Sequence, residues 1–373
     1  STDGRFFPSP WPPRLLEEAV PPGARVGVIG TGLSALDAAL TLTADGSFIR
    51  NGSGEPAYRP SERPRSVTLY SRSGLLPRVR GRTGPYRNAH FTRANLQERR
   101  RANGGVLFLE DLHELLDADL GRHYGRPVDW KGAVRPQGAP QALLERHLRE
   151  ARCGDGPGGE LRWQTVLHQA FPMAREIYLQ LAPGDRKRFD RELTTPFFLF
   201  ASPMPPVNAE KLLALMRAGV VRVARLGNAY SLERRPGESP FVFRYTDPGG
   251  RSREERCSHL VDARGQKRSF ETNSSPLAGN LLASGTVRIE SLPLPGSEEG
   301  AYDTGAVWID PETHRVVQKA PGGSSRVSSR IYAMGAPTRG QILDASMAYS
   351  CARAAGVVAR DLIRGLSSPD RLL

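Results

Sequence analysis

The chain has 373 residues, of which 39% are hydrophobic and 24% charged, a composition typical of a soluble globular protein long enough for two domains. No apolar run approaches the roughly 20 residues that cross a bilayer, and the polar, proline-rich residues 1–13 resemble neither a signal peptide nor a transit peptide. The net charge of +13 comes mainly from scattered arginines rather than from a basic patch interleaved with aromatic residues, so nucleic-acid binding is not favoured.

The first element is an apolar strand at residues 26–29, which runs into a glycine turn and then into an Ala- and Leu-rich helix at 34–43. This order is the first half of a βαβ unit. In Gly30-x-Gly32-x-x-Ala35, the first glycine makes the turn, the second lets the backbone approach a pyrophosphate, and the alanine permits close helix-to-strand packing. We expect cofactor contacts from Gly30, Thr31, Gly32, Leu33, Ser34 and Ala35. The alternative is a tight turn without a ligand.

The second strand, residues 66–71, follows a polar stretch at 45–65 that we interpret as a surface insertion. An NAD or FAD site usually has a carboxylate at the end of this strand, but here the strand runs into Ser71-Arg72. A hydroxyl and a guanidinium suit a 2′-phosphate, so these residues favour NADPH over NADH. The alternative is an ordinary solvated arginine, and the insertion makes the spacing from the glycines longer than the usual distance of about 20 residues.

The middle of the chain, residues 84–200, is predicted to be mainly helical and amphipathic. A helix at 208–217 then leads into a β-meander and a further apolar strand, at 220–225, 229–233, 241–246 and 259–263. The C-terminal part is expected to hold three strands and a long final helix, at 307–310, 314–318, 330–334 and 341–365.

Six motifs spread over the chain carry a family resemblance: SPWP at 9–12, IGTGLSALD at 29–37, SRSGLLP at 71–77, the segment 206–219, LVDARG at 260–265 and IYAMGAPTRG at 331–340. Together they resemble a bacterial family of FAD/NAD(P)-binding proteins, relatives of flavin-dependent monooxygenases and pyridine-nucleotide reductases. The resemblance covers nearly the whole chain, although no single motif is diagnostic.

The resemblance implies an α/β fold with a Rossmann-like NAD(P)-binding domain at 22–265, after a linker at 1–21. The helical insertion at 84–200 and the β-meander belong to that domain, and 266–373 is the C-terminal part of an FAD-binding domain. The implied cofactor contacts include Asp262 and a turn beside the isoalloxazine, formed by Gly335, Ala336, Arg339 and Gly340. From the residues alone, that turn is equally well a plain strand-to-helix connection.

One expected part of the family fold is missing. The FAD domain of such proteins begins with a glycine-rich βαβ unit, and the residues before Arg25 are too few and too polar to form one. The chain is therefore a fragment of a longer protein, or a second polypeptide holds the adenosine half of FAD, or FAD binding has been lost. The first two explanations are favoured, because an apolar strand and helix at 330–365 would otherwise lack their sheet.

The implied activity is that of an NADPH-dependent FAD oxidoreductase, with a monooxygenase acting on a small molecule as the favoured form. The cofactors carry the hydride transfer, so no protein nucleophile is required. His90 and His168 are candidate general acids or bases, although such histidines are more often structural. The alternative is a non-catalytic dinucleotide-binding subunit that needs a partner chain.

The cysteines offer no additional chemistry. Cys153, Cys257 and Cys351 are widely separated and form neither a metal-binding pattern nor a disulfide-reducing pair. They indicate a reduced, cytoplasmic protein without a metal site.

Overall fold

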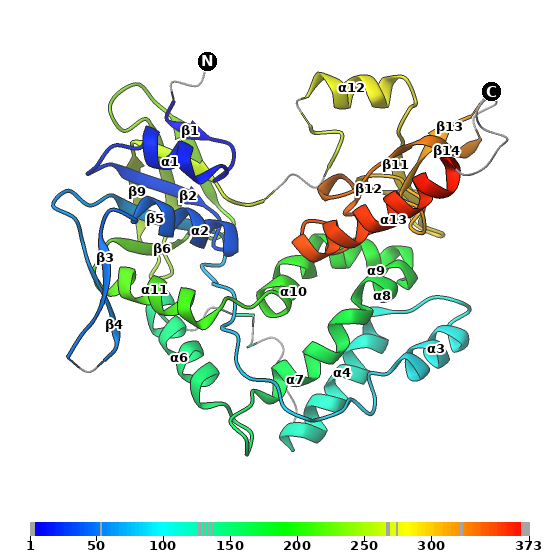
Figure 1. The fold of residues 1–373 in the computed structure, drawn as a ribbon, viewed down its shortest axis with the longest axis horizontal. Coiled ribbons are helices and arrows are strands. Elements are labelled where there is room, and N and C mark those ends of the chain that lie inside the picture. The colour runs from blue at the N-terminus through cyan, green and yellow to red at the C-terminus, as the bar shows by residue number, and fades with distance from the viewer. Residues whose placement is uncertain are drawn as a thin grey trace. The chain divides into compact units, whose positions relative to one another are not determined.

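The computed structural model describes residues 4–52, 54–125, 129, 132, 134–135, 138–265, 269–273, 275–320 and 324–366. The chain forms two compact units, each built from segments that are distant in sequence (Figure 1). Unit 1 comprises Ser1–Asn88, Asp117–Gln169 and Thr194–Gly265, and unit 2 comprises Ala89–Leu116, Ala170–Leu193 and Gln266–Leu373. The segment 84–200 therefore contributes helices to both units instead of forming a single insertion.

A five-stranded sheet forms the centre of unit 1 (Figure 1). Its order is β1 (Phe6–Phe7), β10 (His259–Asp262), β2 (Arg25–Ile29), β5 (Ser66–Ser71) and β6 (Val221–Arg225). All neighbouring strands are parallel. The inner strands β2 and β5 each have four buried residues, because both of their faces are covered. The prediction of an α/β fold with a parallel sheet is confirmed.

Helices α1 (Pro13–Ala19), α2 (Leu33–Leu42), α6 (Pro140–Cys153) and α11 (Pro206–Arg217) pack around the main core of unit 1. Ala35, Ala38 and Ala39 of α2 are fully buried in that core. Their small side chains let the helix backbone lie close to the sheet. Residues 6–7 and 13–19, expected as a linker, instead form an edge strand and a helix of this unit.

A three-stranded antiparallel meander packs against residues of the sheet, and its strands are β7 (Tyr230–Arg234), β8 (Phe241–Thr246) and β9 (Ser252–Cys257). Phe243 of β8 stacks on Tyr70 of β5, with ring centroids 3.9 Å apart. The sequence predicted β7 and β8 but not β9. Strand β9 is largely exposed and rich in arginine and glutamate, which suits the edge of a sheet but removes the hydrophobic signal.

The stretch 45–65, predicted as a surface insertion, forms a hairpin of β3 (Ser47–Arg50) and β4 (Pro56–Arg59). Tyr58 is the anchor of this hairpin. Its ring is buried, and its hydroxyl donates to the Thr43 carbonyl oxygen at 2.7 Å. All four residues of β3 are exposed, including Phe48 and Ile49, and the Gly-, Pro- and Ser-containing stretch around this short strand gave no strand signal.

The helical character predicted for 84–200 is confirmed in the described residues. The helices of this segment, besides α6, are α3 (Arg93–Ala102), α4 (Leu109–Tyr124), α7 (Arg162–Ala170), α8 (Ala174–Gln180), α9 (Pro183–Arg188) and α10 (Thr194–Ala201). Local sequence explains several starts: the Thr92 hydroxyl accepts from the Asn95 amide at 3.2 Å at the start of α3, and prolines begin α6 and α9.

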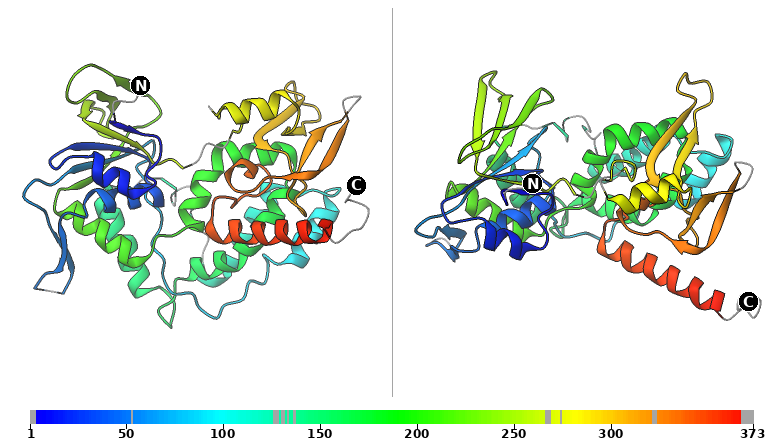
Figure 2. Two further views of the ribbon diagram at one scale, coloured as in Figure 1. Left: turned by 45° about the horizontal axis from the view of Figure 1, so that its top comes forward. Right: turned by 90° about the horizontal axis from the view of Figure 1, so that it is seen from above.

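Unit 2 contains two antiparallel strand pairs, β11 (Ile289–Pro293) with β12 (Ala301–Val307) and β13 (Arg315–Lys319) with β14 (Ser325–Tyr332). The predicted strand at 307–310 was wrong, since β12 ends at Val307. Helices α12 (Pro276–Ala283) and α13 (Ala348–Leu366) complete the unit (Figure 2). The final helix begins at 348 instead of 341, because Gln341 to Met347 form turns.

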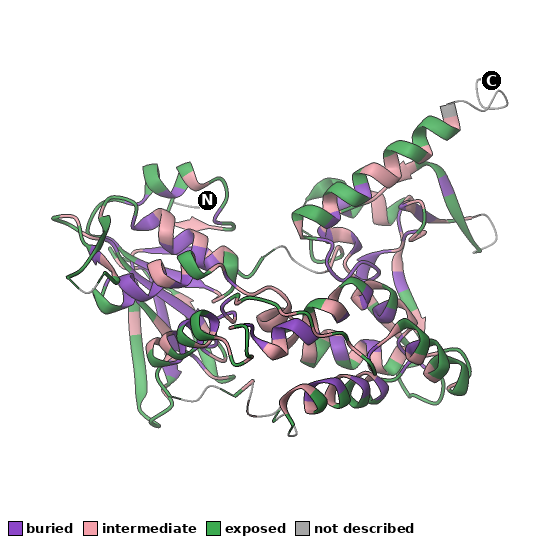
Figure 3. Ribbon diagram, turned by 60° about the horizontal axis from the view of Figure 1, so that its bottom comes forward, coloured by how far each residue is buried: buried purple, intermediate pink, exposed green. Residues whose placement is uncertain are grey.

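Helix α13 is amphipathic and largely exposed (Figure 3). Among its described residues only Ser350 and Ala354 are buried, while Leu362 and Ile363 remain 44% and 62% exposed. Within the described part of the chain, no helix is both long enough and apolar enough to span a bilayer.

Candidate dinucleotide-binding site

The glycine turn between β2 and α2 begins at a position that only glycine fits. Gly30 has a φ of +121°, and its amide donates to the Tyr70 carbonyl oxygen at 2.7 Å. A Cβ atom at this position would lie 2.9 Å from the carbonyl oxygen of Ala263. The close approach of the backbone after β10, together with the positive φ, explains the first glycine of the motif.

The second glycine faces open space. Gly32 is the N-terminal cap of α2, and no side chain accepts a hydrogen bond at that cap. A Cβ atom at Gly32 would meet nothing within 4 Å. Ala35, the last residue of the motif, is fully buried under the helix. The turn therefore leaves the positive end of a ten-residue helix accessible, which is the usual binding place of a phosphate.

This turn lies at a topological switch of the sheet. From β2 the chain proceeds to β5 and β6 on one side, and it returns to β10 on the other side. Ligands of open parallel sheets bind at such switch points, beyond the carboxyl ends of the strands. Asp262 ends β10 in register with Ile29, beside the glycine turn. Its carboxylate already accepts from the Arg264 guanidinium, at 2.9 and 2.7 Å.

Two residues expected to contact the cofactor connect the glycine turn to the loop after β5. The Thr31 hydroxyl donates to the Leu75 carbonyl oxygen at 2.6 Å, and its oxygen lies 3.1 Å from that of Ser71. The Ser71 hydroxyl also accepts from the Gly74 amide at 3.0 Å. The structure thus brings Thr31 and Ser71 together and gives both a role in holding the loop.

Arg72 follows β5 with an exposed side chain, and within the described residues its guanidinium makes no hydrogen bond or ion pair. Arg225, which the sequence analysis did not single out, ends the neighbouring strand β6 in register with Ser71. The loop passes close to it, because a Cβ atom at Gly74 would lie 3.1 Å from the Arg225 Cβ. Arg225 is also exposed. The sequence predicted the strand that Arg225 ends, at 220–225, but grouped it with the meander instead of the parallel sheet.

The two candidate histidines belong to different units. His168 is exposed on α7 in unit 1, and His90 is exposed in unit 2, just before α3. The His90 carbonyl oxygen accepts from the Asn95 side chain at 2.8 Å. A catalytic role for either histidine stays a prediction.

The turn at 335–340 in unit 2 follows β14 and opens with a glycine. Gly335 has a φ of +78°, and a Cβ atom there would meet nothing within 4 Å, so this end of the turn is open. Ala336 is buried, and the Thr338 hydroxyl donates to the Gly335 carbonyl oxygen at 2.8 Å. Arg339 is partly buried. A ligand could approach the backbone at Gly335 without a steric obstacle.

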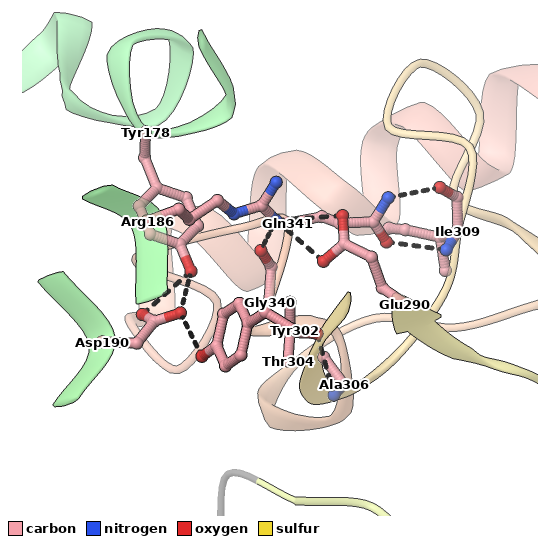
Figure 4. Close-up of polar contacts among 10 residues, drawn as sticks. All are labelled: Tyr178, Arg186, Asp190, Glu290, Tyr302, Thr304, Ala306, Ile309, Gly340 and Gln341. Carbon is pink, nitrogen blue, oxygen red and sulfur yellow. Dashed lines mark hydrogen bonds and ion pairs between the residues drawn. The ribbon is translucent and has the colours of Figure 1, made fainter. Parts of the chain in front are cut away.

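The other end of the turn is enclosed by a buried polar cluster (Figure 4). Gly340 is buried, and a Cβ atom there would collide with Thr304 and Ala306. Its carbonyl oxygen accepts from the Arg186 guanidinium, which also forms an ion pair with Glu290 at 2.8 Å. Gly340 therefore fits the turn as a packing residue, with its backbone held from α9.

The same cluster fixes the neighbouring backbone. The Arg186 guanidinium lies 4.7 Å from the centre of the Tyr178 ring, and the hydroxyls of Tyr178 and Tyr302 each donate to Asp190 at 2.9 Å (Figure 4). The Gln341 side chain forms two bonds of 2.7 Å with the backbone of Ile309, one to the amide and one to the carbonyl. The turn is thus held on both sides of Gly340.

No protein-family model matches the chain. Among curated proteins, it is 26% identical to the uncharacterized protein YdhS of Escherichia coli (strain K12) over an alignment of 321 residues that covers 80% of this chain and 54% of YdhS. The chain therefore spans about half the length of this relative.

Three solved structures are similar over 98% of the chain. The first is the reduced form of the ornithine hydroxylase PvdA from Pseudomonas aeruginosa, with 15% identity, a TM-score of 0.37 and 58% of that chain covered. The second is the Kutzneria sp. 744 ornithine N-hydroxylase, solved as KtzI-FADred-NADP+-L-orn, with 13% identity, a TM-score of 0.40 and 60% covered. The third is the L-lysine 6-monooxygenase from Pseudomonas syringae, with 13% identity, a TM-score of 0.42 and 59% covered. This chain covers less than two thirds of each.

Proposed function

We propose that unit 1 binds NADPH at the turn between β2 and α2. The main support for this proposal is the accessible helix end at Gly32, where no side chain caps the helix and a Cβ atom would meet open space. Backbone amides and the helix dipole would hold the pyrophosphate there. The position of this turn at the switch between β2 and β10 supports the same assignment.

Two unpaired guanidiniums support NADPH over NADH. Arg72 and Arg225 extend from the ends of adjacent strands, and neither has a partner within the described residues. A carboxylate for the ribose hydroxyls is absent from the end of β5, and Asp262 on β10 is already paired with Arg264. Two arginines at the ends of neighbouring strands suit a 2′-phosphate, because a guanidinium forms strong charge-assisted hydrogen bonds to phosphate.

We further propose that the chain is part of an FAD-dependent oxidoreductase, a monooxygenase acting on a small molecule. The strand, turn and helix formed by β14, Gly335 and α13 support an FAD site in unit 2, because the turn is open at Gly335 and α13 exposes apolar residues. When bound, FAD would accept hydride from NADPH. The rest of its site would come from a longer form of the protein or from a second polypeptide.

Cofactor titration tests the NADPH site. We expect NADPH to bind more tightly than NADH, and Arg72→Gln and Arg225→Gln each to weaken NADPH about 10- to 100-fold, the effect of losing one hydrogen bond to a charged group. NADH affinity should not change. Arg59→Gln is the matched control, since Arg59 is an exposed arginine on β4. Equal binding of NADH and NADPH, or equal effects of Arg72→Gln and Arg59→Gln, would contradict the proposal.

NADPH consumption with and without added FAD separates the two functional alternatives. An FAD-dependent rate supports the oxidoreductase. Tight NADPH binding without any FAD-dependent consumption would instead favour a dinucleotide-binding subunit that requires a partner.

A further inference from the structure

Unit 1 contains a half-enclosed cavity of about 270 Å³ whose lining includes none of the glycine-turn residues 30–35. It lies between α6 and the segment that follows β5. Its apolar lining comes from Leu75, Leu76, Leu143, Leu199 and Phe200. The volume is sufficient for a small organic molecule, and the lining favours one with an apolar body.

Arg78 forms the polar wall of this cavity. Its Nη1 lies 2.6 Å from His147 Nε2, and its Nη2 donates to Glu150 at 3.1 Å. The guanidinium also lies over the rings of Trp163 and Phe200, at 5.4 and 5.5 Å from their centres. These contacts fix the position of the positive charge, so the wall is already arranged before a ligand binds.

His147 is 4% exposed and takes the neutral form in this wall. An arginine can only donate, so His147 Nε2 accepts its hydrogen bond and the proton resides on Nδ1. Burial and the guanidiniums of Arg78 and Arg146 lower the pKa of His147 to about 3. The histidine therefore adds no charge that would oppose or replace the arginines.

Positive charge exceeds negative charge around the cavity. Three arginines line it, namely Arg78, Arg135 and Arg146, against the two carboxylates of Asp129 and Glu150. Arg146 Nε is 3.9 Å from Glu150, which already accepts from Arg78, and Arg135 has no ion-pair partner in the part of the chain described here. Among the lining residues that the structure describes, arginines therefore outnumber carboxylates by one.

We propose that this cavity binds a small organic monocarboxylate. Its apolar body would lie against Leu75, Leu143 and Phe200, and its carboxylate would meet Arg146 at the rim. The site is distinct from the dinucleotide turn but shares a loop with it. Leu75 lines the cavity, and its carbonyl oxygen accepts from the Thr31 hydroxyl.

Calorimetric titration with benzoate tests the proposal, with benzyl alcohol and inorganic phosphate as probes of the apolar and the charged part alone. We expect benzoate to bind saturably to one site and both probes to bind at least about tenfold more weakly. Arg146→Gln should weaken benzoate about tenfold, as expected for one hydrogen bond to a charged group. Arg149→Gln, an exposed arginine of the same helix that does not line the cavity, should not weaken it.

Three results would overturn the inference. Equal benzoate affinity of Arg146→Gln and Arg149→Gln would place binding elsewhere, and phosphate as strong as benzoate would indicate a plain anion site. Loss of benzoate binding in saturating NADPH would mean that the cofactor itself occupies the cavity. If Arg146→Gln does not fold, Leu143→Phe, which fills the cavity without altering charge, should abolish binding while leaving NADPH affinity intact.

Discussion

Replacing Arg186 by methionine is the sharpest test of the buried cluster that holds the 340 turn. Arg186 and Glu290 have side chains that are 4% and 7% exposed, and they form an ion pair at 2.8 Å. Arg186→Met leaves a buried carboxylate without its counter-charge and removes a donor from the Gly340 carbonyl oxygen. Breaking a buried pair in this way costs about 3–5 kcal/mol. Most of that cost comes from the stranded carboxylate.

Hydrogen exchange measured by mass spectrometry localises this loss without assuming that the whole chain unfolds in one step. Amides of β12 and of the turn at 336–341 should exchange at least about 100-fold faster in Arg186→Met, since about 3 kcal/mol corresponds to roughly two orders of magnitude. Amides of β5 in unit 1 are the internal control and should keep their native rates. Acceleration of both units alike would mean that the cluster does not act locally.

A second variant separates the pair from its isolated charge. Replacing Glu290 by methionine as well removes the stranded carboxylate, so Arg186→Met/Glu290→Met should recover most of the lost protection. Burial raises the pKa of the Glu290 carboxyl even in the presence of Arg186. In the single variant, the penalty should therefore shrink as the pH falls, because a protonated carboxyl needs no counter-charge. A double variant no better than the single one would refute this reasoning.

Three further outcomes follow from the geometry of unit 1. The pKa of His147 is about 3 in the folded state and ordinarily 6.5, so the unfolded state binds a proton below pH 6.5 that the folded state does not. The free energy of unfolding should therefore fall by up to about 1.4 kcal/mol per pH unit between pH 6.5 and pH 3. Urea midpoints should be lower at pH 5 than at pH 7, and His147→Gln should lack this difference. Gly30→Ala should lower the melting temperature, because the new Cβ would lie 2.9 Å from Ala263 at a φ of +121°, a destabilisation of about 1–3 kcal/mol. Gly32→Ala should leave the melting temperature unchanged but weaken NADPH binding at least about tenfold, because the new methyl group would enter only the open space where the phosphate binds. A parallel loss of stability would argue against an open phosphate site.

The sequence predicted the elements whose signal is local. Strand β2 contains an apolar run and β5 is rich in β-branched and aromatic residues, because both strands are covered on both faces. The helix after Gly32 follows from its alanines and leucines. Strand β9 escaped prediction because an exposed edge strand rich in arginine and glutamate does not reveal its pairing, and β3 because it is only four residues long. Arg225 was missed for a different reason: its proximity to the loop after Ser71 depends on which strands are neighbours, which no local pattern specifies.

Long-range contacts also explain why the chain does not divide where its composition changes. The helical residues 170–193 belong to unit 2, and their most buried polar contact, Arg186 with Glu290, joins positions separated by 104 residues. A chain ending at Gly265 would keep the β2–α2 turn and the parallel sheet, but it would leave Arg186 and Asp190 without Glu290, Gly340 and Tyr302. A buried charged residue whose partner is missing destabilises its surroundings, so these helices would lose stability without the C-terminal residues.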